Sequence, residues 1–219
     1  MAFELRPPGM TERLRGELSN SKLTSADRIR LIDFVAGDSN PAAGKALLEV
    51  LVPATPPEVR NRAVDVLLVG LPGQWSLLVK DGTAGKALES MVANNTNAMA
   101  TEYLALAGAI SHGQAISMAT TIALSPAAAP ALRERAVAAL GKLPTDSSVK
   151  VLETLAKEGG KLTGKACLAL GELASARTKT PASDPALKAL QGLLNNEAAK
   201  SASLEAIAST RAGTSWLLE

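Results

Sequence analysis

Apolar residues recur every three or four positions in the stretch from Ala131 to Leu143, ALRERAVAALGKL. Leucine, valine and alanine form the apolar stripe, and most of the charged residues lie off it. This spacing predicts an amphipathic helix whose small alanines allow a neighbouring helix to approach closely. We expect the helix to begin at Pro126, with Ser125 as its N-cap, and to end before Pro144.

Similar patterns recur along the 219 residues, separated by short loops rich in proline, glycine and serine. Residues 1–10 are expected to form an extended lead, and residues 73–93 a broken pair of turns around Asp81 and Gly82. No long alternating run of Val, Ile, Thr and Tyr predicts a strand, so we expect an all-α fold. The predicted helices, including the one that starts at Pro126, span residues 11–19, 25–36, 41–52, 55–70, 96–110, 113–124, 126–143, 147–157, 161–176, 184–194, 197–209 and 213–219.

Six copies of the helix that contains Ala136 can be aligned, at separations of 30 to 40 residues. A leucine-rich helix precedes each copy, so every repeat is a pair of helices. Self-similarity at such a period is typical of an α-solenoid. We therefore expect one domain over residues 11–219, made of about six helix pairs and the start of a seventh. The aligned residues are Leu31, Ala63, Tyr103, Ala136, Ala166 and Ala202.

The sequence of the second helix in each pair resembles the HEAT-repeat family, in which this helix has the form V-R-x-x-A-x-x-x-L-G. The matching stretches are EVRNRAVDVLLVG at residues 58–70, ALRERAVAALG at 131–141 and LTGKACLALG at 162–171. The resemblance implies a right-handed solenoid whose second helices line a concave face. The third copy departs from the pattern with Glu102 and Tyr103, and the last, KSASLEAIAS, has no arginine.

Two short tryptophan-containing stretches, LPGQWSLLVKDG and TRAGTSWLLE, resemble the helical-repeat segments of large secreted haem-binding proteins of planctomycetes. In those proteins a HEAT segment lies between a dehydrogenase-like β-propeller and a c-type cytochrome domain. This resemblance implies a segment of a larger, extracytoplasmic protein; without it, a cytoplasmic protein is expected. The chain contains no C-x-x-C-H motif, so we expect no haem or other cofactor on this segment.

Composition narrows the possible functions. Hydrophobic residues make up 47% of the chain but aromatic residues only 2%, which suits closely packed helices rather than an aromatic core. With 23 basic and 21 acidic residues the formal net charge is +2, and a dedicated nucleic-acid binder would carry a denser basic stripe. No apolar run reaches transmembrane length, so we expect no membrane insertion.

Basic residues recur three positions and one position before the aligned residue of each second helix. As a ladder on the concave face they would attract an acidic segment or a phosphate backbone. Alternatively, their stems pack between repeats and their heads bind turn carbonyls or acids. The ladder breaks in the third and sixth repeats. The candidate binding residues are Arg28, Arg30, Arg60, Arg62, Glu102, Tyr103, Arg133, Arg135 and Lys165.

Other reactive or aromatic residues are expected to be structural. His112, the only histidine, lacks nearby ligands in sequence and is interpreted as a turn residue. Cys167, the only cysteine, lies on an apolar run and is interpreted as a buried, inert thiol. Trp75 and Trp216 are expected to pack between repeats, and Tyr103 to fill space where its neighbours have alanine. The KEGGK stretch lacks the context of a phosphate loop.

These observations favour a non-catalytic scaffold that binds a partner protein or an adjacent domain of the same polypeptide on its concave face. The sequence offers no catalytic or metal-binding cluster. Two alternatives stay open: a nucleic-acid-binding HEAT protein, or a cofactor-handling or enzymatic one of the glycosylase-like or bilin-lyase-like kind. An uncapped solenoid end also exposes apolar surface, so a dimer through one end is a further possibility.

Overall fold

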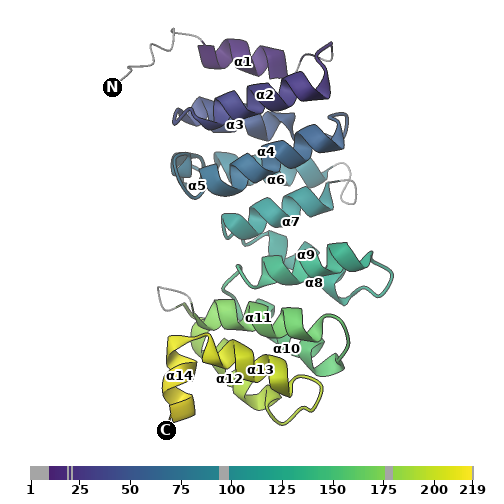
Figure 1. The fold of residues 1–219 in the computed structure, drawn as a ribbon, viewed down its shortest axis with the longest axis vertical. Helices are drawn as coiled ribbons and strands as arrows, with labels where there is room; N and C mark the ends of the chain where they lie inside the picture. Colours follow the sequence, from purple (N-terminus) through teal and green to yellow (C-terminus); the bar gives the residue numbers. More distant parts are fainter. Residues whose placement is uncertain (1–9, 19, 21, 94–98, 176–179, 219) are drawn as a thin grey trace. The chain divides into compact units, whose positions relative to one another are not determined.

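The computed structural model describes residues 10–18, 20, 22–93, 99–175 and 180–218, and within these ranges the fold is all-α, as predicted (Figure 1). No strand occurs in the described ranges. The helices are α1 Met10–Leu18, α2 Ser25–Ala36, α3 Pro41–Val50, α4 Pro57–Gly70, α5 Ser76–Lys80, α6 Thr83–Ala93, α7 Ala100–Ala109, α8 Ala115–Leu124, α9 Pro130–Leu140, α10 Asp146–Glu158, α11 Thr163–Ala174, α12 Ser183–Leu193, α13 Lys200–Ala208 and α14 Arg211–Leu218.

The contacts divide the chain into two compact units, residues 1–106 and residues 107–219, with the boundary inside α7. In the first unit α3 packs against α1 and α6, and α2 packs against α4. Successive helices α1 to α4 also contact one another. The unit therefore has a row of first helices, α1, α3 and α6, beside a row of second helices that contains α2 and α4.

The core of the first unit is closed by one large residue. Trp75 is fully buried, and its indole nitrogen donates a hydrogen bond of 2.8 Å to the carbonyl of Asp38. The ring fits because two glycines make room for it. A β-carbon on Gly44 would lie 2.8 Å from Cδ2 of Trp75, and one on Gly70 would overlap the six-membered ring.

The second unit has the same two rows, but its helices meet through small residues. The first helices α8, α10 and α12 pack consecutively, as do the second helices α9, α11 and α13. The glycine that ends the repeated sequence pattern touches an alanine of the next second helix. A β-carbon on Gly141 would lie 2.8 Å from Cβ of Ala169, and one on Gly171 would lie 3.4 Å from Cβ of Ala206.

The predicted start of the helix around Ala136 is wrong. Ser125 is the C-cap of α8, and its amide donates to the carbonyl of Ile122. Helix α9 begins four residues later than expected, at Pro130, after Ala129 in extended geometry. A residue that precedes proline is driven out of the helical region, so Ala129 cannot continue a helix begun at Pro126.

Other boundaries need smaller adjustments. Helix α1 begins at Met10, one residue earlier than predicted, and α14 begins at Arg211 rather than at residue 213. The predicted extended lead before Met10 lies outside the described residues. The predicted break near residue 82 is confirmed: Gly82 has φ 79° and separates α5 from α6. The predicted N-cap at Thr96 or Asn97 lies outside the described residues.

The tertiary contacts change the alignment of the last repeat by one residue. Ala202 is only half-buried, whereas Ser203 is fully buried and its hydroxyl lies 3.4 Å from Sγ of Cys167. Ala206 follows Ser203 by the three residues that separate Ala139 from Ala136. The last copy of the helix therefore aligns on Ser203, one position later than the sequence suggested.

Candidate functional site

The basic residues singled out in the sequence fall into two groups, which differ in what their side chains touch. Those three positions before the aligned residue are turned into the protein. Those one position before it lie on the exposed side of the second helices. We call this exposed side the second-helix face and describe it separately in each unit.

The inward group consists of arginines that bind main-chain carbonyls of the segment before their own helix, at the end of the preceding helix for Arg28 and Arg133 and in the connecting loop for Arg60. Nε of Arg28 donates to the carbonyl of Leu18 at 2.9 Å, and Nε of Arg133 donates to that of Ala123 at 3.0 Å. Nη1 of Arg60 donates to the carbonyl of Thr55 at 2.7 Å. Helix ends leave carbonyls without partners, and a cation there also complements the helix dipole. These arginines fasten α2, α4 and α9 to the segments that precede them.

Arg60 has a second partner, which explains why the third repeat departs from the pattern. Its Nε lies 3.0 Å from Oε1 of Glu102, and the two side chains are only 13% and 9% exposed. Glu102 stands where the neighbouring repeats carry a basic residue. It therefore supplies the charge that balances Arg60, and removing one member would leave the other buried and unpaired.

Tyr103, the other departure in this repeat, is 3% exposed. Its pKa is raised, first by burial and then by the nearby charge of Glu89. The ring of Tyr103 therefore belongs to the core, in agreement with the interpretation that it fills space.

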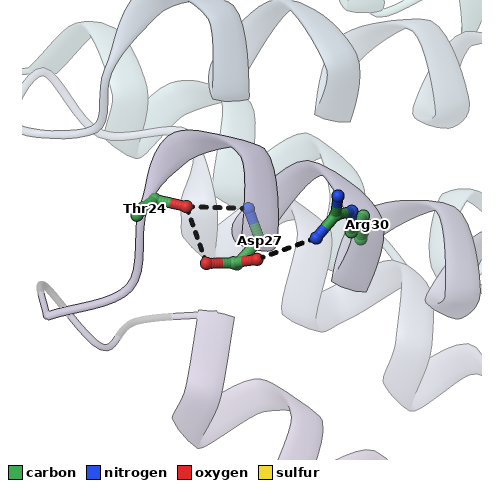
Figure 2. A network of polar contacts seen from close by, with 3 residues as sticks. All are labelled: Thr24, Asp27 and Arg30. Carbon is green, nitrogen blue, oxygen red and sulfur yellow. Dashed lines mark hydrogen bonds and ion pairs between the residues drawn. The ribbon is translucent and has the colours of Figure 1, made fainter.

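The outward group in the first unit is held in local ion pairs. Figure 2 shows that the hydroxyl of Thr24 caps α2, accepting the amide of Asp27 at 3.2 Å and donating to its carboxylate at 2.7 Å. The same carboxylate lies 3.2 Å from Nη1 of Arg30, whose side chain is 80% exposed. Arg62 of α4 pairs with Asp33 of α2 at 2.6 Å. Such exposed pairs add little stability but lower the net positive charge of the face.

In the second unit, fewer of the outward basic residues have their positive charge balanced by a neighbouring carboxylate. Lys165 of α11 lies 3.8 Å from Glu134 of α9, and both side chains are about half exposed. Arg135 is exposed, and it makes no ion pair among the residues that the structure describes. Lys142, directly after the C-cap of α9, is also exposed.

Large apolar residues on the same helices are the feature that sequence reasoning missed. Phe34 is 48% exposed on α2 and Val69 is 77% exposed on α4; Val69 and Arg62 line one shallow hollow of about 390 Å³. In the second unit Leu168 is 52% exposed on α11 and Leu204 is 47% exposed on α13. In a sequence where apolar residues are everywhere, only the tertiary contacts distinguish these from core positions.

The two tryptophans have different environments, although both were expected to pack between repeats. Trp75 is buried, as predicted. Trp216 is 41% exposed, and the adjacent Leu217 and Leu218 are also exposed. The prediction for Trp216 is wrong because α14 packs on α13, and its apolar side is left largely open in the described part of the chain.

The single cysteine and histidine have structural surroundings. Cys167 is fully buried, and burial raises its thiol pKa, partly offset by the hydrogen bond with Ser203. The amide of His112 donates to the carbonyl of Ala107 at 2.8 Å, directly after Ser111 with φ 53°. Over the described ranges, no group of three His, Cys, Asp or Glu side chains could hold a metal ion.

The KEGGK stretch forms a turn. Its glycines, Gly159 and Gly160, have φ of 77° and 89°, a region that other residues rarely adopt.

No protein-family model matches the sequence, and a search of curated proteins finds no match. In the described part of the chain no helix is both long and apolar enough to span a membrane.

Proposed function

We propose that this protein is a HEAT-type α-solenoid that acts as a non-catalytic scaffold and binds a protein partner on its second-helix face. The observation that carries the proposal is the group of large apolar residues exposed on second helices, Phe34 and Val69 in the first unit and Leu168 and Leu204 in the second. Exposed apolar residues within a polar rim are a common mark of a protein-binding surface.

The use of the other repeated residues supports the HEAT assignment. The arginine of the repeated pattern donates a hydrogen bond to a main-chain carbonyl of the preceding helix, as at Arg133. The glycine of the pattern packs against an alanine of the next second helix, as at Gly141. Both residues are thus explained by packing between adjacent helices. The recurring pattern accounts for the fold, and the positions that vary between repeats are left to determine the partner.

The charge of the face favours a protein over a phosphate backbone. Arg30 and Arg62 are matched by Asp27 and Asp33, so the first unit presents paired charges of both signs. Nucleic-acid binding would have to rest on the second unit, where Arg135 and Lys142 are exposed. That alternative predicts an affinity that falls steeply with salt.

Site-specific photo-crosslinking tests the proposal. A photoreactive amino acid is placed at Ala138, exposed on second helix α9, and in a matched variant at Thr154, exposed on first helix α10. In extracts of the native cell we expect discrete crosslinked species from position 138 only. Their loss in the variant with Leu168→Glu and Leu204→Glu would tie them to the apolar residues. Crosslinks from position 154 alone, or insensitivity to the double substitution, would contradict the proposal.

A further inference from the structure

A groove in the first unit lies on the opposite row of helices from the face discussed so far. It runs between first helices α3 and α6 and has a volume of about 570 Å³. Its floor is apolar: Leu48, Leu51 and Met91 are 4%, 2% and 8% exposed. Val52 at its edge is 44% exposed. The groove therefore has a narrow apolar floor, and Val52 is the large apolar side chain exposed beside it.

The charged residues around this floor are predominantly basic. Lys45 of α3 and Lys86 of α6 line the groove from its two walls, both exposed, and neither makes an ion pair among the described residues. The acidic residue in the lining is Glu49. Arg15 of α1 neutralises it with two hydrogen bonds, from Nε and, at 2.7 Å, from Nη2.

Asp81, an acid whose charge interacts with that of Lys86, is already engaged in hydrogen bonds. The carboxylate of Asp81 accepts the amide of Thr83 at 2.9 Å. Its pKa is lowered mainly by hydrogen bonds from Thr83, and the charge of Lys86 is the smallest of the causes. The groove thus combines an apolar floor with two exposed lysines that form no ion pair among the described residues.

We propose that this groove binds an acidic amphipathic helix of a partner protein, with apolar side chains on the floor and carboxylates facing Lys45 and Lys86. An amphipathic helix in a groove between two helices is a common recognition mode, in which positions i, i+3, i+4 and i+7 supply the anchors. On α6 the lining runs from Thr83 to Met91, about 12 Å, which matches roughly two turns of a bound helix. On the other wall it runs from Lys45 of α3 to Pro53, beyond the end of that helix.

A partner helix fits this groove better than a small ligand does. Small-ligand sites bury most of the ligand surface. Here six lining residues are exposed, so a bound molecule would keep one side in water. This groove is a different surface from the second-helix face, so each of the two proposals can fail without the other.

The test uses a synthetic helical peptide of about four turns, with leucines at i, i+3, i+4 and i+7 and glutamates on its flanks. A second peptide has lysine in place of every glutamate. Binding is followed by amide chemical-shift changes in the full chain and by fluorescence anisotropy at two salt concentrations. We expect the acidic peptide to shift amides of α3 and α6, with an affinity that falls with salt, and the basic peptide to bind at least tenfold more weakly.

Variants assign the effect to the groove. Lys45→Glu with Lys86→Glu should weaken acidic-peptide binding at least tenfold. The matched pair Lys22→Glu with Lys80→Glu changes the net charge equally but lies outside the groove lining, and should change binding less than threefold. Val52→Glu, at an exposed position, tests the apolar contact without disturbing the core. Circular dichroism confirms that each variant is folded.

The inference is overturned if the groove variants bind like the wild type, or if both peptides bind equally. It is also overturned if the shifts fall on the second-helix face, a result that would support the proposed function instead. Groove binding without crosslinks at position 138 would uphold this inference while the proposed function fails.

Discussion

The glycine that ends the repeated pattern of the second helix faces a tryptophan in the first unit and an alanine in the second. Gly70 makes room for the ring of Trp75, while Gly141 brings α9 against Ala169 of α11. The first unit is thus packed around one large side chain and one shielded ion pair, whereas the second is packed through small residues. The same sequence pattern supports two ways of bringing helices together, because the residue opposite the glycine decides which is used.

Removing the large side chain should have the largest effect on stability. Trp75→Ala deletes a fully buried ring and leaves a cavity in the core. The two glycines beside the ring have no side chains that could fill this cavity. We expect a loss of about 4 kcal/mol in the free energy of unfolding. Urea unfolding followed by circular dichroism measures it. Trp216→Ala is the control, because its ring is partly exposed, and should cost less than about 1 kcal/mol. Equal losses would remove the special role given to Trp75.

Breaking the shielded ion pair should be the next largest effect. Glu102→Ala leaves the guanidinium of Arg60 largely buried with main-chain carbonyls as its remaining partners. We expect a loss of about 3 kcal/mol. Glu134→Ala, which breaks the exposed pair with Lys165 in the second unit, should stay within about 0.5 kcal/mol.

A double-mutant cycle sharpens this comparison. If Arg60 and Glu102 act as a pair, the loss in the double variant of both residues to alanine should be smaller than the sum of the single losses. Additive losses would mean that the two side chains stabilise the unit separately.

In the second unit the sensitive change is the addition of a methyl group. Gly141→Ala places a β-carbon 2.8 Å from Cβ and 3.0 Å from Cα of Ala169, so the helices must separate. We expect a loss of about 2 kcal/mol. At Gly164 nothing lies within 4 Å of an added β-carbon, and alanine should stabilise α11 by about 0.5–1 kcal/mol. Unfolding curves that move in the same direction for both variants would contradict close packing at Gly141.

The smallest effect concerns the thiol between α11 and α13. Burial raises the pKa of Cys167 above its ordinary value of 9.0, so the folded state favours the neutral thiol. Its contribution to stability is complete below about pH 9 and is lost as the pH rises through the raised, folded-state pKa. The stability difference between the wild type and Cys167→Ala should therefore shrink above pH 9.

Alkylation gives a second measurement on the same group. At pH 8 iodoacetamide should modify Cys167 only as fast as the unit opens, because the thiolate is the reactive form. In a Cys167→Ala background, Ser201→Cys puts a thiol at an exposed position of α13 and should react at the rate of a free thiol. Similar rates at both positions would show that Cys167 is accessible.

Helical periodicity predicted the elements well because each helix carries its own signals. Proline at a helix start and glycine at a break act through local backbone geometry, as at Pro57 and Gly82. The start of α9 was wrong because two prolines in the same loop, Pro126 and Pro130, offered competing starts. A local signal cannot choose between them.

The candidate site was less predictable. The spacing of the basic residues correctly identified a recurring feature, but spacing alone does not separate Arg28, which is 8% exposed, from Arg30, which is 80% exposed at its side chain. Two residues apart on a helix, the two arginines point to different sides. Which side faces a carbonyl and which faces water depends on the helices packed around them.

The sequence by itself thus determined that this chain is all-α, with a helix pattern that recurs through both units. It did so because amphipathic periodicity and capping are properties of contiguous residues. Only the tertiary structure decided that Glu102 forms an ion pair with Arg60, that Gly70 leaves room for the ring of Trp75, and that Val69 and Leu168 remain exposed. Each of these depends on a partner from another helix, and a contact between residues distant in the chain has no signature in the local pattern.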